Sequence, residues 1–131
     1  MKMLMRWLHS LVALLALLLA GPVWLLASNQ VATDGHWSSL DRSSAGIAPD
    51  PAVNAEAVVQ VYSARAYNWR GAFGEHIWIA TKTENADSYR LHQVLSWRRP
   101  TVVSSIDTPD RAWFGSPPTL LADYRGEAAA Q

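Results

Sequence analysis

Residues 75–97, which decide the fold of the soluble part, read EHIWIATKTENADSYRLHQVLSW. Residues Glu75–Lys82 are rich in β-branched and aromatic side chains, which favours a strand. The polar residues 83–87 predict a connection. Residues Ser88–Trp97 then alternate between apolar and polar side chains, with few exceptions, and this period of two predicts a second strand. The stretch therefore predicts a β-hairpin within a small, mainly antiparallel sheet domain.

The sequence on either side adds further elements to this hairpin. Residues Ala57–Ala64 predict a strand before it, and Tyr67–Gly74, with two glycines and several aromatic residues, predict a shaped loop. After it, Thr101–Ser105 predict a short strand, and Thr119–Arg125 predict the start of a C-terminal helix. The expected fold class is α+β, with an N-terminal transmembrane helix ahead of the sheet domain.

The N-terminal residues 1–27 are expected to form that membrane helix. No Lys, Arg, Asp or Glu occurs from Trp7 to Ala27, and a helix of that length spans roughly 31 Å, close to the hydrocarbon core of a bilayer. Lys2 and Arg6 precede the run and are expected to stay in the cytoplasm. The sequence therefore predicts a single-pass inner-membrane protein that contacts the bilayer through residues 7–27, with a periplasmic or other extracytoplasmic domain.

A cleaved signal peptide is the alternative interpretation of the same segment. Cleavage after Ala27 would place Leu25 where a small residue is required, so an uncleaved anchor is favoured. Residues 28–54 are rich in Ser, Ala, Asp, Gly and Pro, which predicts a largely solvated linker. Residues 55–131 are expected to form the extracytoplasmic domain.

Composition excludes several function classes. The chain has no cysteine and a formal net charge of zero. Thiol nucleophiles, disulfides and cysteine-ligated metals are therefore excluded, and no clustered basic patch predicts a nucleic-acid partner. Neither a cofactor motif nor a metal-ligand spacing is present, so no cofactor and no metal site is predicted.

Two histidines in the hairpin are candidates for chemistry. His76 opens a strand directly after a glycine-bearing loop, a place where a scaffold can hold a general base. The alternative is a hydrogen-bonded, partly buried histidine at a strand end. His92 lies on the polar face of the next strand and is expected to be solvated. Whether the two share a face depends on the register of the hairpin.

Trp69 and Arg70 are candidates for ligand binding, because an arginine stacked beside an indole suits an anionic ligand. The alternative is that this cluster packs the loop onto a small core. Asp107 and Asp110 are expected to cap backbone groups in a Pro-containing turn. The remaining large aromatic residues are expected to fill the core of a domain short of apolar volume: Trp78, Trp97, Trp113 and Phe114.

The motifs of the chain, in order, are AGIAPDP at 45–51, VVQVYSAR at 58–65, WRGAF at 69–73, HIWIA at 76–80, WFG at 113–115 and LLADYRG at 120–126. In combination they resemble a family of bacterial membrane-anchored proteins known only as a domain of unknown function. Members of that family continue into a further helix and a Pro-Asn-Ser-Asn-Thr-Phe-like motif that this chain lacks. The resemblance thus implies a member truncated at its C-terminus.

The functional expectation is a membrane-tethered extracytoplasmic domain that binds or interacts with a ligand or an envelope partner. The layout of the family also resembles that of permuted papain-like amidases. This resemblance implies an alternative, a fragment of an amidase-like hydrolase with His76 as general base.

Overall fold

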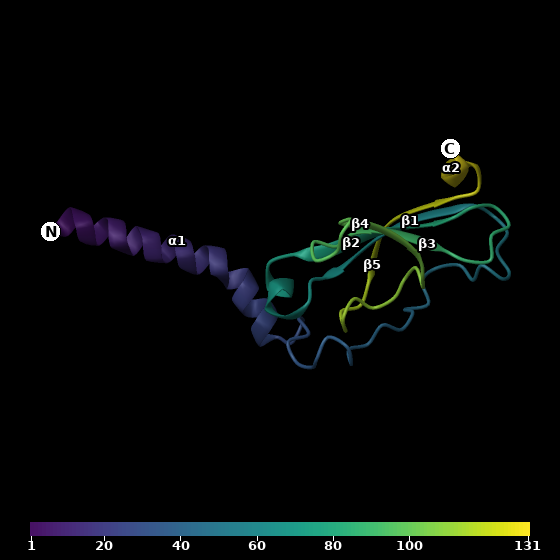
Figure 1. The fold of residues 1–131 in the computed structure, drawn as a ribbon. Coiled ribbons are helices and arrows are strands. Elements are labelled where there is room, and N and C mark those ends of the chain that lie inside the picture. Colours follow the sequence, from purple (N-terminus) through teal and green to yellow (C-terminus); the bar gives the residue numbers. More distant parts are fainter.

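Helix α1, Lys2–Ala27, projects away from the rest of the chain in the computed structural model, which describes residues 1–131 (Figure 1). None of its residues is fully buried. It is long and apolar enough to cross a membrane, a property that signal sequences share. The expected apolar N-terminal helix is therefore present.

The sheet domain contains five strands: β1 (Val58–Arg65), β2 (Glu75–Lys82), β3 (Arg90–Val94), β4 (Val102–Ile106) and β5 (Thr119–Arg125). Their order in the sheet is β4-β3-β2-β1-β5, and every neighbouring pair is antiparallel. A short 3₁₀ helix, η1 (Asn68–Ala72), connects β1 to β2, and a single helical turn, α2 (Glu127–Ala130), follows β5. The α+β class and the antiparallel hairpin of β2 and β3 are confirmed.

One face of the sheet carries the core. The registers of β1 with β2 and of β2 with β3 bring Tyr62, Trp78 and Gln93 into one row across the three strands. Tyr62 and Trp78 stack with ring centroids 5.6 Å apart. Trp113, from the loop before β5, covers this row. Leu120, on β5, packs against the same core cluster. Aromatic residues thus supply most of the volume of a core beneath a single small sheet.

The opposite face of the sheet is largely uncovered. Its exposed apolar side chains are Ile77 and Ile79 on β2, Val94 on β3, and Val102 and Ile106 on β4. An antiparallel sheet commonly has one solvated face, but that face is then mostly polar. A cluster of exposed apolar side chains of this kind is typical of an interaction surface.

Two predicted elements differ from the observed ones. The helix expected from Thr119 is wrong, because Thr119–Arg125 is strand β5, hydrogen-bonded along β1. This Leu- and Ala-containing segment has some helical propensity. As strand β5 it instead supplies hydrogen-bond partners to the backbone groups at the edge of β1, which would otherwise be unpaired. The strand expected over Ser88–Trp97 is shorter, Arg90–Val94. Trp97 lies in the following turn and is exposed rather than in the core.

Segment 28–54 contains no regular helix or strand and runs beside the domain (Figure 1). Val31 is buried, and the backbone of Ser43 and Ala45 hydrogen-bonds to residues 110–112. Ile47 and Ala48 pack against the core. A largely solvated backbone was expected here, and residues 43–48 depart from that expectation because their polar groups have partners in the loop before β5.

Candidate functional site

A pocket of about 610 Å³ lies where five separate segments of the domain meet. Its lining is Trp37, Ala66, Tyr67, Arg70, Glu75, His76, Ser96, Trp97, Trp113 and Phe114. Half of these side chains are Trp, Tyr or Phe, and the polar ones include a cation, a carboxylate, an imidazole and a hydroxyl. A mainly aromatic concavity with a few convergent polar groups is the usual form of a ligand site.

His76 lies at the centre of this arrangement. It is the second residue of β2, on the core face of the sheet, and its ring stacks on Trp113 with centroids 3.6 Å apart and an interplanar angle of 16°. Trp78 lies alongside at 5.8 Å. His76 Nε2 and Gln93 Oε1 are 3.0 Å apart. Because the amide oxygen is an acceptor, Nε2 donates, and Nδ1 of the neutral ring carries the free lone pair.

Burial makes His76 a weaker base than an ordinary histidine. Removal of the ring from water lowers its pKa from 6.5, and the positive charge of Arg111 acts in the same direction, while the hydrogen bond to Gln93 opposes them. His76 is therefore neutral at pH 7. A neutral imidazole with one free nitrogen can accept a hydrogen bond or a proton from a ligand.

The stability of the domain is expected to fall as the pH is lowered below about 6.5, the ordinary histidine value. Above it, His76 is neutral in both the folded and the unfolded chain. Below it, the unfolded chain takes up the proton first, so stability decreases until the pH passes the lowered pKa of the folded state. Urea unfolding at several pH values should show a steeper decline for the wild type than for His76→Gln. Equal declines would contradict a lowered pKa at His76.

The wall opposite the sheet is a tight turn that presents two aromatic residues. Trp113 and Ser116 form an isolated β-bridge around it. Phe114 and Gly115 both have positive φ, 47° and 86°, which turns the chain sharply. Phe114 meets Trp113 edge-to-face at 4.9 Å, and the guanidinium of Arg42 lies 4.3 Å from the Phe114 ring centroid. These contacts fix the aromatic wall from both sides.

The rim of the pocket is more exposed. Trp97 is 63% exposed and Trp37 is 54% exposed, so both indoles offer a free face to solvent. Tyr67, whose ring lies 5.4 Å from that of Phe114, donates a hydrogen bond from its hydroxyl to the Gly35 carbonyl. Segment 28–54 is thereby held against the β1–η1 connection, and Trp37 becomes part of the pocket.

The structure brings together two of the three predicted site residues. His76 and Arg70 line the same pocket. Trp69 does not; it is 55% exposed on η1, with the Arg70 guanidinium 5.3 Å from its ring. The Arg70 guanidinium thus lies beside the exposed Trp69 indole, while Gly71 and Ala72 of the same 3₁₀ helix are buried.

The second histidine of the hairpin lies elsewhere. His92 pairs with Ile79 across β2 and β3, whereas His76 shares the face of Trp78. The two histidines therefore point to opposite faces of the sheet and cannot bind one metal ion. His92 is 3.1 Å from Thr81 Oγ1 and 2.8 Å from Ser104 Oγ through its two ring nitrogens.

The two aspartates before Trp113 act as caps, as expected. Asp107 accepts from the backbone N–H of Thr108 and forms an ion pair with Arg111. Asp110, only 1% exposed, accepts from Ser44 Oγ at 2.7 Å and from the backbone N–H of Ile47 and Ala48 at 2.5 and 3.1 Å. Asp110 thus connects segment 28–54 to the loop that presents Trp113.

Most of the pocket was not predicted from the sequence. Trp113 and Phe114 were expected only as core, Trp37 as part of the linker, and Glu75 and Ser96 as ordinary strand residues. One signal pointed toward such a site, the seven tryptophans in 131 residues. Five of them lie outside α1, which is more than the small core uses, since only Trp78 and Trp113 are buried.

The comparisons with known proteins give one family. Residues 56–131 match the family model described as "Protein of unknown function (DUF3750)", and these residues make up more than half of the chain. No curated protein and no solved structure matches the chain. The matched region begins just before β1 and contains the whole sheet, including most of the residues that line the pocket. The chain therefore belongs to the DUF3750 family of proteins of unknown function.

Proposed function

We propose that this protein is a membrane-tethered extracytoplasmic binding domain whose ligand occupies the pocket around His76. The single observation that carries this proposal is the convergence of five aromatic side chains with Arg70, Glu75 and His76 in one open concavity. The exposed indole of Trp97 does not stabilise the free domain. A ligand that covers this indole would gain binding energy from the contact.

The chemistry of the pocket favours a ligand with a flat ring and polar groups at its edge. The free faces of Trp37 and Trp97 suit stacking, and the neutral ring of His76 supplies a hydrogen-bond acceptor. Arg70 suits a carboxylate or another anion, whereas Glu75 suits a hydroxyl or a cation. Sugars and aromatic side chains of peptides both have this combination of a ring face and a polar edge.

Replacing Trp97 with alanine is expected to weaken ligand binding by at least about fivefold, because a stacked ring contributes about 1 kcal/mol beyond its buried area. The probes are a set of monosaccharides, N-acetylated sugars and aromatic amino-acid amides, tested by saturation-transfer NMR on the full chain in detergent micelles. Trp69→Ala is the matched control, since Trp69 is similarly exposed but lies outside the pocket. If both variants bind every probe as the wild type does, the pocket is not the ligand site.

The orientation in the membrane is proposed from the charges that flank α1. Lys2 and Arg6 precede the apolar run, and positive residues are retained on the cytoplasmic side. Alkaline phosphatase fused after Gln131 should therefore be active in cells, as it is only outside the cytoplasm. A matched fusion after Arg6, ahead of the apolar run, should be inactive. An inactive enzyme at Gln131, at normal expression, would refute the proposed topology.

The alternative function is an amidase-like hydrolase fragment with His76 as general base. The observation that favours it is the hydrogen bond that orients the neutral His76 ring through Gln93 in an open pocket, since a general base needs an orienting partner. The hydroxyl of Ser96 lines the same pocket. Hydrolysis of fluorogenic amides that is lost in His76→Gln, with the fold retained, would support the enzyme, and its absence in the wild type supports the binding domain.

A further inference from the structure

The 3₁₀ helix η1 packs against the last turns of α1 (Figure 1). Residues of α1 up to Gly21 are exposed, whereas Pro22, Leu25 and Leu26 are half-buried. These three positions follow helical spacing and form one face. Gly71 permits the close approach of η1 to Val31, just beyond the helix, because a Cβ there would lie 2.9 Å from the Val31 side chain and 2.5 Å from the Ala66 carbonyl oxygen.

This packing sets the depth of η1 relative to a bilayer crossed by α1. The apolar run from Trp7 to Ala27 is just long enough for the hydrocarbon core, so its last turns lie at the boundary between the hydrocarbon and the headgroups. Trp24 lies in the same turns and is 67% exposed, where interfacial tryptophans are usually found. A segment that packs beside these turns therefore lies at the level of the headgroups.

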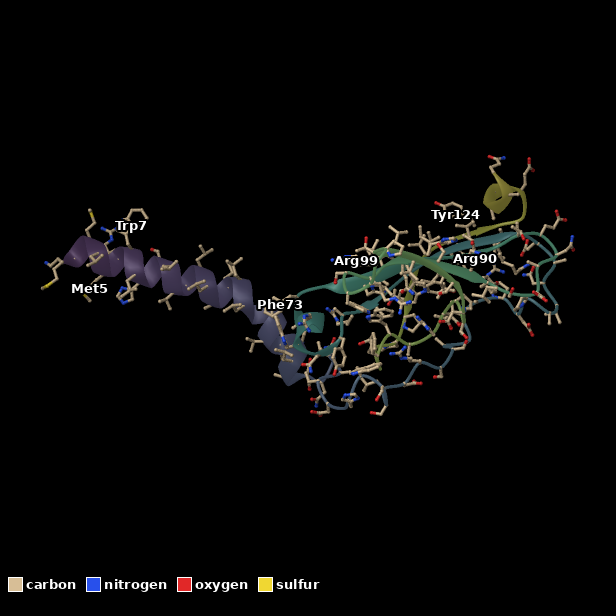
Figure 2. The ribbon with its side chains drawn as sticks, viewed as in Figure 1. Met5, Trp7, Phe73, Arg90, Arg99 and Tyr124 are labelled. Atoms are coloured by element: carbon tan, nitrogen blue, oxygen red, sulfur yellow. The ribbon has the colours of Figure 1, made fainter.

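The surface of η1 at this level is aromatic. Trp69 and Phe73 are 55% and 61% exposed, and their rings meet edge-to-face at 6.1 Å. Figure 2 shows Phe73 beside the C-terminal part of α1, while Arg90 and Tyr124 lie toward the other end of the domain. The cation of Arg70, 5.3 Å from the Trp69 ring, adds a group that suits lipid phosphates.

We propose that Trp69 and Phe73, with Arg70 between them in the sequence, form a second membrane contact, inserted among the headgroups of the leaflet from which α1 emerges. This contact rests on the membrane tether of the proposed function. It fixes the domain relative to the bilayer, because α1 and η1 then hold it at two points. It also places the pocket near the membrane surface, since Arg70 belongs to both η1 and the pocket.

The experiment uses the absence of cysteine in the chain to attach one fluorophore at a time to the full-length protein. Gly74→Cys reports on η1 without removing an aromatic residue, and a Cβ there meets nothing within 4 Å. Glu84→Cys lies in the turn after β2, at the opposite end of that strand. Leu18→Cys reports on α1 itself. Each protein is reconstituted in phosphatidylcholine vesicles that contain a lipid with a nitroxide close to the headgroup.

The label at Gly74 should be quenched several-fold more strongly than the label at Glu84. Replacing Trp69 and Phe73 with serine in the Gly74→Cys protein should reduce quenching to the Glu84 level. The matched control replaces Ile106 and Tyr124, which are similarly exposed, with serine. Tyr124, and Arg90, which pairs with Ile106 across β3 and β4, lie toward the end of the domain away from α1 (Figure 2), so quenching at Gly74 should persist. In separate vesicles whose nitroxide lies deep in the acyl chains, quenching of the Leu18 label establishes the tether.

Two results would overturn the proposal, and they are distinguishable. If the Leu18 label is quenched and the Gly74 label is no more quenched than the Glu84 label, the tether stands and the second contact is wrong. If the Gly74 label stays quenched after both aromatic residues are replaced, these side chains do not make the contact. An unquenched Leu18 label would instead remove the tether, and with it the basis for any second contact.

Discussion

Replacing Trp78 with alanine is expected to lower the free energy of unfolding by about 3–5 kcal/mol, the usual cost of emptying a large buried aromatic site. Trp78 is 2% exposed, stacks on Tyr62, and donates a hydrogen bond from Nε1 to the Pro109 carbonyl at 2.7 Å. The substitution leaves both a cavity and an unpaired buried carbonyl. For a domain of this size, the loss is a large part of the total stability of about 5–15 kcal/mol.

Urea unfolding of the full chain in micelles, followed by near-ultraviolet circular dichroism, measures this effect. Trp78→Phe should lose less, because the ring is partly kept and the hydrogen bond alone is worth about 1 kcal/mol. Trp97→Ala is the control, since an exposed indole removed from the surface should change stability by no more than about 0.5 kcal/mol. Equal losses for Trp78→Ala and Trp97→Ala would show that Trp78 is not at the centre of the core.

Replacing Asp110 with alanine is expected to cost about 3 kcal/mol or more. Its buried carboxylate accepts three hydrogen bonds from Ser44, Ile47 and Ala48, and bonds to a charged group contribute about 1.5–3 kcal/mol each, though not additively. Loss of the carboxylate leaves two backbone N–H groups without an acceptor. We expect segment 28–54 to detach from the loop before β5 and the aromatic pocket to lose Trp37 from its rim.

Hydrogen exchange identifies the site of this effect as well as its size. The amides of Ile47 and Ala48 should lose protection in Asp110→Ala, while amides in β1 and β2 keep more of theirs. Asp110→Asn should lose less, because the amide oxygen can still accept from the backbone and the amide nitrogen can donate to Ser44 Oγ. Asp107→Ala is the control at a more exposed carboxylate. Unchanged protection at residues 47 and 48 in Asp110→Ala would refute the anchoring role.

The predictability of the candidate site depends on how local each signal is. His76 was predicted because a histidine that opens an apolar strand is visible in the sequence. Its neighbours were not, because Trp113, Trp97 and Trp37 come from segments far apart in the chain. The partner of His76 also depends on register: Trp78 pairs with Gln93, and a shift of one residue would have placed His92 on that face instead.

The sequence by itself determined the elements whose physical causes are local. The apolar run of α1, the strands β1, β2 and β4, and the hairpin between β2 and β3 follow from hydrophobicity, period and turn residues over short windows. Only the tertiary structure decided the rest. Thr119–Arg125 became a strand because the edge of β1 required a partner, and segment 28–54 joined the domain because Asp110 satisfies its backbone. These outcomes depend on contacts between residues more than sixty positions apart, which no local pattern can specify.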